Sequence, residues 1–392
     1  RNEQESLEIT LSFFIIASSY LISYFGKTQT YTAVLSANQE RYIYSNVLNI
    51  IKLICDILTI FVIVWFRSLV AIAILILIVK IIEEVIMRFV VKKKYSYLKE
   101  VSDKNTSMIK MTKDLVWMQV GTLVLNNVDA VLIMHFLGPI WVSIYTSYNF
   151  ILRYLNEIAS RLNYATVYSF GNVFAKKESD RAYPLFKELQ SLFMIIAIAM
   201  SLTFLLGIRT FILFWIKDAN YILSYTTATL FTLTTFFYIL YLPLLSIINS
   251  NGLFKENKYH ILTCALINVI LSLILVNFFQ INGLLIATIT SFIVNIILKC
   301  NLINKKIFNN INYFKLISPY IIITISFIFI IIISKPLEIY LLKNITSILS
   351  IVITLFSIFI ILFIILFIIM YLVDSNTRNL YQRIINLIKK RK

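Results

Sequence analysis

Residues 345–373 read ITSILSIVITLFSIFIILFIILFIIMYLV, a run of 29 residues without one Asp, Glu, Lys or Arg. Inside a bilayer every peptide group needs a hydrogen-bond partner within the protein, and an α-helix supplies one for each of them. About 20 apolar residues in a helix cross a hydrocarbon core of about 30 Å. This stretch therefore predicts a transmembrane helix.

Ten more apolar runs divide the rest of the chain. Over all 392 residues, 59% are apolar and only 14% are charged, whereas soluble domains average about 45–50% and 25%. The sequence predicts an all-α membrane protein with about eleven transmembrane helices. The other ten spans are expected at roughly 8–25, 43–66, 68–88, 115–137, 139–160, 189–208, 222–248, 260–278, 282–303 and 315–334.

The net charge of +17 does not indicate nucleic-acid binding, because the basic residues lie in short segments between the apolar runs. Counted loop by loop, 27 Lys and Arg residues fall on one side of the predicted membrane and six on the other, with Lys52, Lys80 and Arg153 inside spans. Lys299 is counted with the cytoplasmic loop that follows it. Since cytoplasmic loops carry the excess of Lys and Arg, we expect a cytoplasmic C-terminus and an external residue 1.

The spans also repeat at a fixed interval. Those that start near 8, 43 and 68 are followed about 214–217 residues later by spans that start near 222, 260 and 282, as in the parallel repeats of several transporters. The three spans between 115 and 208 have no upstream partner. We therefore expect that the intact protein has three more helices and that this sequence is a fragment. The alternative is a chance similarity between helical hairpins.

No motif in the sequence indicates an enzyme. The sequence contains no phosphate-binding loop, no Gly-rich dinucleotide fingerprint and no cluster of His and Cys residues. Its three cysteines, Cys55, Cys264 and Cys300, lie in or beside apolar runs without paired spacing. We expect no catalytic residue, no cofactor and no metal site.

Polar residues inside the spans are the strongest functional signal. A charge at the centre of a transmembrane helix costs roughly 2.5–3.5 kcal/mol, so such residues should face one another or a water-filled cavity. In three spans they recur at intervals that favour one face of the helix, a wider one in 43–66. These positions are Asn46, Asn49, Lys52 and Asp56; Gln119, Thr122, Asn126 and Asp129; and Tyr145, Asn149, Arg153, Asn156 and Ser160.

Neighbouring charges allow a purely structural interpretation. Each embedded cation has a carboxylate three or four residues further on, so ion pairs within one helix could merely neutralise buried charge. The pairs are Lys52 with Asp56, Lys80 with Glu83 or Glu84, and Arg153 with Glu157. Asp129 has no cation nearby in sequence. It is either a protonated, inert carboxyl group or a site for a coupling ion.

A longer stretch resembles a known family. The run NVDAVLI at 127–133 is followed by Phe136-Leu137-Gly138 and by VSIYTSY at 142–148, with Gly171-Asn172 and the segment 176–186 beyond. It is similar to the start of the second lobe in Wzx-type polysaccharide (O-antigen) flippases of the multidrug/oligosaccharidyl-lipid/polysaccharide exporter superfamily. The resemblance implies fourteen helices, in two lobes of six and a terminal pair. This chain would lack the first three.

The resemblance also implies a domain plan and a function. Residues 1–98 would complete the N-terminal lobe, 99–114 would link the lobes, 115–306 would form the C-terminal lobe, and 307–392 the terminal helix pair and basic tail. The protein would sit in the bacterial inner membrane. It would flip a polyprenyl-diphosphate-linked oligosaccharide, such as an O-antigen or capsule unit, to the outer leaflet by alternating access. Its partners would be this substrate, membrane lipids and polysaccharide-assembly proteins.

Two other function classes stay open at this point. A multidrug cation exporter of the same superfamily would favour an acidic, aromatic cavity. A membrane glycosyltransferase or polymerase would need a large external loop, which the sequence lacks. For the flippase, Arg153 and then Lys52 are expected to bind the diphosphate. The other expected cavity residues are Tyr145, Asn149 and Asn156, which would bond sugar hydroxyls, and Asn126, with Asp129 as the coupling residue.

The topology can be tested with an impermeant thiol reagent on intact cells. Cysteines at Lys94, Lys177 and Lys305 should be shielded, and cysteines at Asp218 and Glu338 should be labelled, because 27 of the basic residues lie on the inner side. Labelling at Lys94 in sealed cells would refute this orientation.

Overall fold

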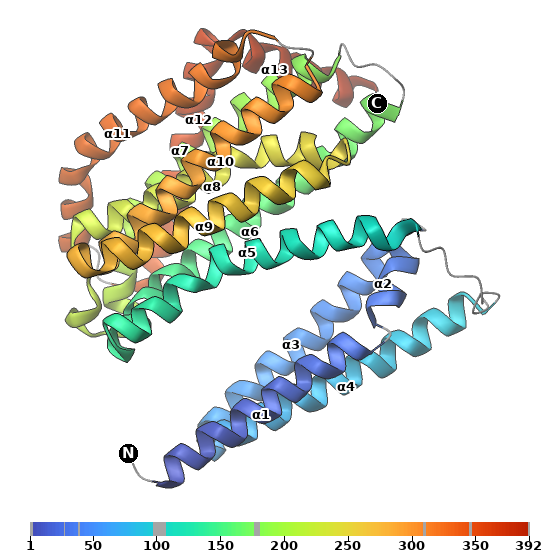
Figure 1. The fold of residues 1–392 in the computed structure, drawn as a ribbon. Coiled ribbons are helices and arrows are strands. Elements are labelled where there is room, and N and C mark those ends of the chain that lie inside the picture. The colour runs from blue at the N-terminus through green and yellow to red at the C-terminus, as the bar shows by residue number, and fades with distance from the viewer. Residues whose placement is uncertain are drawn as a thin grey trace. The chain divides into compact units, whose positions relative to one another are not determined.

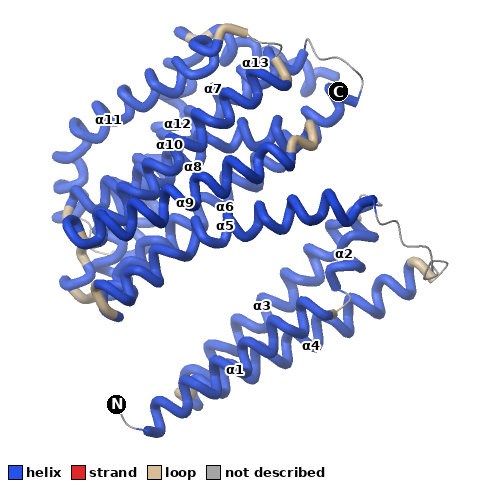
Figure 2. The backbone as a smooth tube through the Cα atoms, viewed as in Figure 1, coloured by secondary structure: helices blue, strands red, loops and turns tan. Residues whose placement is uncertain are grey.

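The computed structural model describes the backbone of residues 3–26, 28–37, 40–96, 107–175, 181–308, 311–344 and 347–390. Within these residues the chain is helical throughout, with thirteen α-helices and no strand (Figure 2). The expected all-α class is therefore confirmed. Eight of the described helices are long and apolar enough to cross a membrane, with candidate spans at Tyr42–Phe66, Lys113–Phe136, Ala182–Ile216, Tyr225–Ser250, Phe254–Phe279, Ile281–Lys306, Tyr313–Lys343 and Ile348–Val373.

Three further spans were expected, and each falls in a helix that is less apolar or shorter. Helix α1 (Glu3–Phe25) is apolar only over Ser6–Ile22. Helices α4 (Leu69–Lys94) and α6 (Pro139–Ala175) carry charges in their middle portions. That these three helices cross the membrane, and the total of eleven, therefore stay predictions.

The chain divides into two compact units, Arg1–Lys104 and Asn105–Lys392. The division falls inside the segment 99–114 that the sequence predicts as a linker. The assignment of the units to two lobes of a flippase stays a prediction.

In the first unit, α4 is the central helix. It packs against α1, the short α2 (Thr28–Ala37) and α3 (Arg41–Phe66). Carboxylates of neighbouring segments bind residues near both ends of α4. Glu8 of α1 accepts hydrogen bonds from the Ser68 hydroxyl and the Leu69 amide, both at 2.8 Å, and so caps the start of α4.

Glu40, which lies just before α3, makes the contacts at the C-terminal end of α4. Its carboxylate pairs with Lys94 at 2.8 Å and accepts a hydrogen bond from Tyr95. These bonds, that from Lys94 foremost, hold the pKa of Glu40 below its usual value. None of the described side chains of α3 is buried, so this helix presents its apolar surface outward.

In the second unit, helices α5 to α10 pack into one bundle (Figure 1). Helix α9 packs against α5 and α10, α10 also against α8, and α8 against α6 and α7. Helix α7 is the most deeply buried. The bounds are α5 (Ser107–Phe136), α7 (Ala182–Ile216), α8 (Tyr225–Ser250), α9 (Phe254–Phe279) and α10 (Ile281–Lys306).

The two helical triplets expected to repeat share a packing order. In the second unit, α10 packs against both α8 and α9, which scarcely touch. In the first unit, α4 packs in the same way against α1 and α3. The third helix is thus central in both triplets, as an internal repeat requires, although descent from a repeat stays a prediction.

Helix α7 also carries the terminal helices. Helices α11 (Tyr313–Asn344), α12 (Ile348–Val373) and the amphipathic α13 (Ser375–Lys390) all pack against it. In α12 only Ile351 is buried; one face of the helix is half-buried against the bundle, and the opposite apolar face is exposed. This exposure agrees with the peripheral, lipid-facing position expected for the terminal pair.

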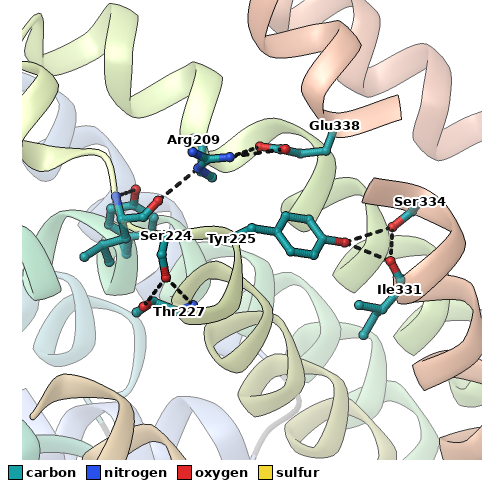
Figure 3. A network of polar contacts seen from close by, with 9 residues as sticks. Arg209, Ser224, Tyr225, Thr227, Ile331, Ser334 and Glu338 are labelled. Carbon is teal, nitrogen blue, oxygen red and sulfur yellow. Dashed lines mark hydrogen bonds and ion pairs between the residues drawn. The ribbon is translucent and has the colours of Figure 1, made fainter. Parts of the chain in front are cut away.

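Polar contacts clamp α7 to these helices at both ends. At one end, Arg209 donates to both carboxylate oxygens of Glu338 on α11, at 2.9 and 3.2 Å, and to the Leu223 carbonyl at 2.9 Å. Figure 3 shows this pair beside Tyr225, whose hydroxyl donates to the Ile331 carbonyl of α11. These contacts join α7, α8 and α11 at one end of the unit.

At the other end, Ser191 donates to Asp374 at 2.5 Å, and Arg383 of α13 pairs with Glu188 at 3.1 Å. Burial acts to raise the pKa of Asp374, but hydrogen bonds from Ser191, Asn376 and Thr377 outweigh it and hold the pKa below its usual value. Asp374 therefore stays ionised at neutral pH, where it joins α7 to the start of α13.

The position of Glu338 corrects one expectation from the sequence. Its side chain is 1% exposed, so a cysteine placed there would be shielded whichever side of the membrane it faced. Asp218, in the segment between α7 and α8, is partly exposed and stays a valid external position. Lys177 lies outside the described residues.

The clamp predicts a specific double-mutant cycle. Arg209→Leu leaves Glu338 buried without its partner and should lower the free energy of unfolding by about 3–5 kcal/mol. Arg209→Leu combined with Glu338→Leu should lose less than the sum of the single changes, because no lone charge is left behind. Thermal or denaturant unfolding of the purified protein in detergent measures each value. Additive losses would show that the two side chains do not interact.

Candidate functional site

The polar stripes of α5 and α6 separate into two places in the structure. Asn126, Asn127 and Arg153 lie exposed on the surface of the second unit, whereas Asp129 and Tyr145 are buried inside it. Asn126 and Asp129 are about 60° apart around the helix axis, so the edge of the buried face runs between them. The sequence pattern placed Asn126 with Asp129 on one face of α5 and Arg153 with Tyr145 on one face of α6. In the structure Asn126 and Arg153 are exposed, and Asp129 and Tyr145 are buried.

Arg153 is the exposed cation of this surface. Its Nη2 donates to the Asn126 carbonyl at 3.2 Å and to Asn127 Oδ1 at 3.4 Å. The ion pair with Glu157 that the spacing allowed does not form, because Glu157 pairs with Arg161 at 2.6 Å. A pair in which the acid precedes the base by four residues is the more favourable order in a helix. Arg153 therefore keeps an uncompensated charge within the described part of the chain.

The remaining α6 candidates have separate environments. Asn149 is half-buried. Asn156 is half-buried too, and its buried Oδ1 has no hydrogen-bond partner. The Ser160 hydroxyl bonds to that of Tyr238 on α8 at 2.7 Å, so it connects α6 to the bundle.

Asp129 forms the centre of a buried polar network. Its Oδ2 accepts hydrogen bonds from Tyr145 of α6 and Thr288 of α10, both at 3.1 Å. Asn268 of α9 in turn donates to the Thr288 hydroxyl at 3.1 Å. Four helices thus meet at one carboxyl group that is 4% exposed. Its Oδ1 is buried without a partner, which leaves one oxygen to carry a proton or meet a small cation.

The two embedded lysines of the first unit also differ in their surroundings. Lys52 is exposed on α3, and no ion pair joins it to Asp56 in the described part of the chain. Lys80 pairs with Glu83 at 2.8 Å, as expected from its spacing. Because Lys52 and Arg153 belong to different units, their joint action on a substrate stays a prediction.

Sequence reasoning missed a buried cation. Lys299, counted with a cytoplasmic loop, is 0% exposed within α10 and donates a hydrogen bond to Asn257 of α9. A signal was present, since Lys299 follows Asn295 by one helical turn and continues a row of polar residues at Thr288, Ser291 and Asn295. This pattern does not predict that Lys299 is buried, because a basic residue near a helix end usually reaches water.

The comparisons with known proteins assign no relatives. No family model matches the sequence, and no curated protein matches it either. The resemblance to polysaccharide flippases therefore rests on the residues themselves and stays a prediction.

The network around Asp129 predicts different costs for two tyrosines of the same helix. Tyr145→Phe removes a donor from a buried carboxyl group and should lower the free energy of unfolding by about 1–3 kcal/mol. Tyr154→Phe, on the exposed side of α6, should change it by less than about 0.5 kcal/mol. Denaturant unfolding in detergent compares them. Equal changes in the free energy of unfolding for the two variants would show that the Tyr145 hydroxyl does not stabilise the network.

Proposed function

We propose that this protein moves a lipid-linked oligosaccharide across the membrane, with the exposed α5–α6 surface as part of the substrate route. The observation that carries the proposal is Arg153, an exposed guanidinium without a carboxylate partner in the described part of the chain. It lies about 21 Å along α6 from Pro139, at 1.5 Å per residue. At that depth it is far from either end of a helix of 37 residues.

The cost of this charge argues for a wet surface. An Arg at the centre of a transmembrane helix costs roughly 2.5–3.5 kcal/mol if it faces lipid. Asn126 and Asn127 beside it add exposed amide groups. We infer that this surface lines a water-filled route and that Arg153 attracts an anion there.

A diphosphate is the anion that suits Arg153 best. Nη2 is held by α5, while Nη1 and Nε have no partner among the described contacts. A guanidinium binds phosphate oxygens through parallel N–H groups. Asn149, Asn156 and Asn126 are placed to bond sugar hydroxyls, and Lys52 of the first unit is the second cation of the proposal. Tyr145, which was expected to bind sugar, is not part of this proposal, because its hydroxyl donates to Asp129.

Asp129 is the proposed coupling residue. A carboxyl group buried among four helices changes charge when it gains or loses a proton or cation. That change alters the packing of α5, α6, α9 and α10 around it, which is how a small ion can drive alternating access. The alternative of a cation exporter is less well supported, because Arg153 would repel a cationic substrate from this surface.

The proposal predicts graded transport defects at one position. Arg153→Ala should abolish transport at near-normal protein level, whereas Arg153→Lys should retain part of it, since Lys keeps the charge but loses the planar fork. Arg161→Ala combined with Glu157→Ala removes the neighbouring exposed ion pair and frees no carboxylate for Arg153. This double variant is the matched control and should transport normally.

The measurement is the level of cytoplasm-facing lipid-linked oligosaccharide in a deletion strain complemented with the full reading frame. We expect accumulation in the Arg153→Ala strain and none in the strain that carries both Glu157→Ala and Arg161→Ala. Normal transport by Arg153→Ala would remove the main support for a cationic route.

A further inference from the structure

A continuous polar seam runs through the contact between α9 and α10. Most side chains that line such a contact in a membrane bundle are apolar, yet polar groups recur here at each turn of α10 from Thr288 to Lys299 and at three positions of α9. They face one another from Asp129 and Thr288 at one end to Asn257 and Lys299 at the other. We call this the α9–α10 seam, formed by Asn257, Cys264 and Asn268 of α9 and Thr288, Ser291, Asn295 and Lys299 of α10.

Lys299 is unusual among the charges of this protein. Its side chain is 0% exposed, and its bond to Asn257 is with a neutral amide. Cys264 and His260, both on α9, are the titratable neighbours of Lys299, and no carboxylate pairs with it among the described residues. A buried amine without a counter-charge is strongly disfavoured when protonated. It can release its proton, which an arginine in the same place could not do.

The seam, together with Asp129 at its end, also holds polar atoms that no group in the described part of the chain satisfies. Asp129 Oδ1, Asn268 Oδ1, Asn295 Oδ1 and Asn257 Nδ2 are buried and without hydrogen-bond partners. Each such atom costs about 1–3 kcal/mol if it is left bare. Buried water typically satisfies groups of this kind, with about three hydrogen bonds per molecule. Their succession along one helix contact therefore favours a file of water molecules.

The dimensions suit a path through the membrane interior. Thr288 and Lys299 are eleven residues apart on α10, which is about 16 Å along the helix. Thr288 lies seven residues after the start of α10 at Ile281, and Lys299 lies seven before its end at Lys306. The seam thus covers the middle of the helix, and the basic end that contains Lys305 and Lys306 is the expected cytoplasmic side.

We propose that the α9–α10 seam is a proton path that joins Asp129 to the cytoplasm through Lys299. This rests on the coupling role of Asp129 in the proposed function and makes the coupling ion a proton. A proton on Asp129 Oδ1 leaves for the water file, and the carboxyl keeps the bonding electron pair as a carboxylate. At the far end the neutral Lys299 amine takes up a proton with its lone pair and then passes it to cytoplasmic water. Nothing is consumed, and one proton has crossed the seam.

This path is separate from the proposed substrate surface. Arg153 and Asn126 are exposed, whereas the seam is enclosed by α9 and α10. Protons and substrate would therefore use different routes in the same unit. The competing interpretation is that Lys299 is a permanent cation that merely fastens α10 to Asn257.

The first test detects the water and leaves every seam residue in place. Cys264 is fully buried in the seam, and a reference cysteine at Ala228 is fully buried in the apolar core of the unit. With Cys55 and Cys300 replaced by alanine, the chain in lipid nanodiscs is exposed to hydroxyl radicals formed from water by X-rays. Cys264 should oxidise several-fold faster than the cysteine at position 228. Equal protection of both would overturn the hydrated seam.

The second test measures proton passage in liposomes that contain a pH-sensitive dye, with the membrane potential clamped. The wild-type chain should acidify the lumen faster than protein-free liposomes after external acid is added. Lys299→Met and Lys299→Arg should both fall to the protein-free rate, since neither side chain can exchange a proton. Lys187→Met is the matched control, because Lys187 is also a buried lysine, on α7, and its bonds to Gln190 and the Lys315 carbonyl involve no residue of the seam.

If the Lys299→Arg variant passed protons at the wild-type rate, a fixed cation would suffice, and the proposal would be overturned. So would a wild-type rate equal to that of protein-free liposomes. Neither measurement uses an oligosaccharide, so a failure of the proposed substrate would leave both results unchanged and is told apart from a failure of the proton path.

Discussion

The fold depends on whether each charged side chain finds a partner where little water is available. Apolar contacts alone give helices in a bilayer little reason to choose particular partners, because lipid tails are as apolar as leucine. In this protein, pairs of polar side chains specify which helices pack together. Arg209 and Glu338 bind α7 to α11, Ser191 and Asp374 bind α7 to the start of α13, and Glu8 and Ser68 bind α1 to α4. An unpaired member of such a set is costly, so the charges left unpaired point to function.

Two unpaired groups stand out, and they differ in their surroundings. Arg153 is exposed and kept from Glu157, whereas Asp129 is buried with one bare oxygen. The first suits a large anion that arrives from outside the bundle, and the second suits a proton that arrives through it. Tyr145 belongs to the second group, although it shares helix α6 with Arg153. A transporter needs these two environments to be separate yet mechanically connected, and α5 and α6 contribute to both.

Much of the helical fold could be predicted from the sequence, because a run such as 345–373 has only one stable form in a bilayer. The pairing of charges could not. Glu157 stands four residues from both Arg153 and Arg161, so spacing alone does not choose between them. The burial of Lys299 depends on Asn257, which is 42 residues away, and only the packing of α9 on α10 brings the two together. Residue patterns show which face is polar, but the neighbouring helix decides whether that face is exposed or enclosed.

The central claim is that the exposed surface around Asn126 and Arg153 meets water at membrane depth. A spin label at Asn126 in the reconstituted protein, compared with one at Ile361 on the exposed surface of α12, tests it directly. The Asn126 label should collide mainly with a water-soluble relaxation reagent, and the Ile361 label mainly with oxygen dissolved in the lipid. If the Asn126 label behaved like the Ile361 label, the surface would face lipid and the proposed substrate route would not exist.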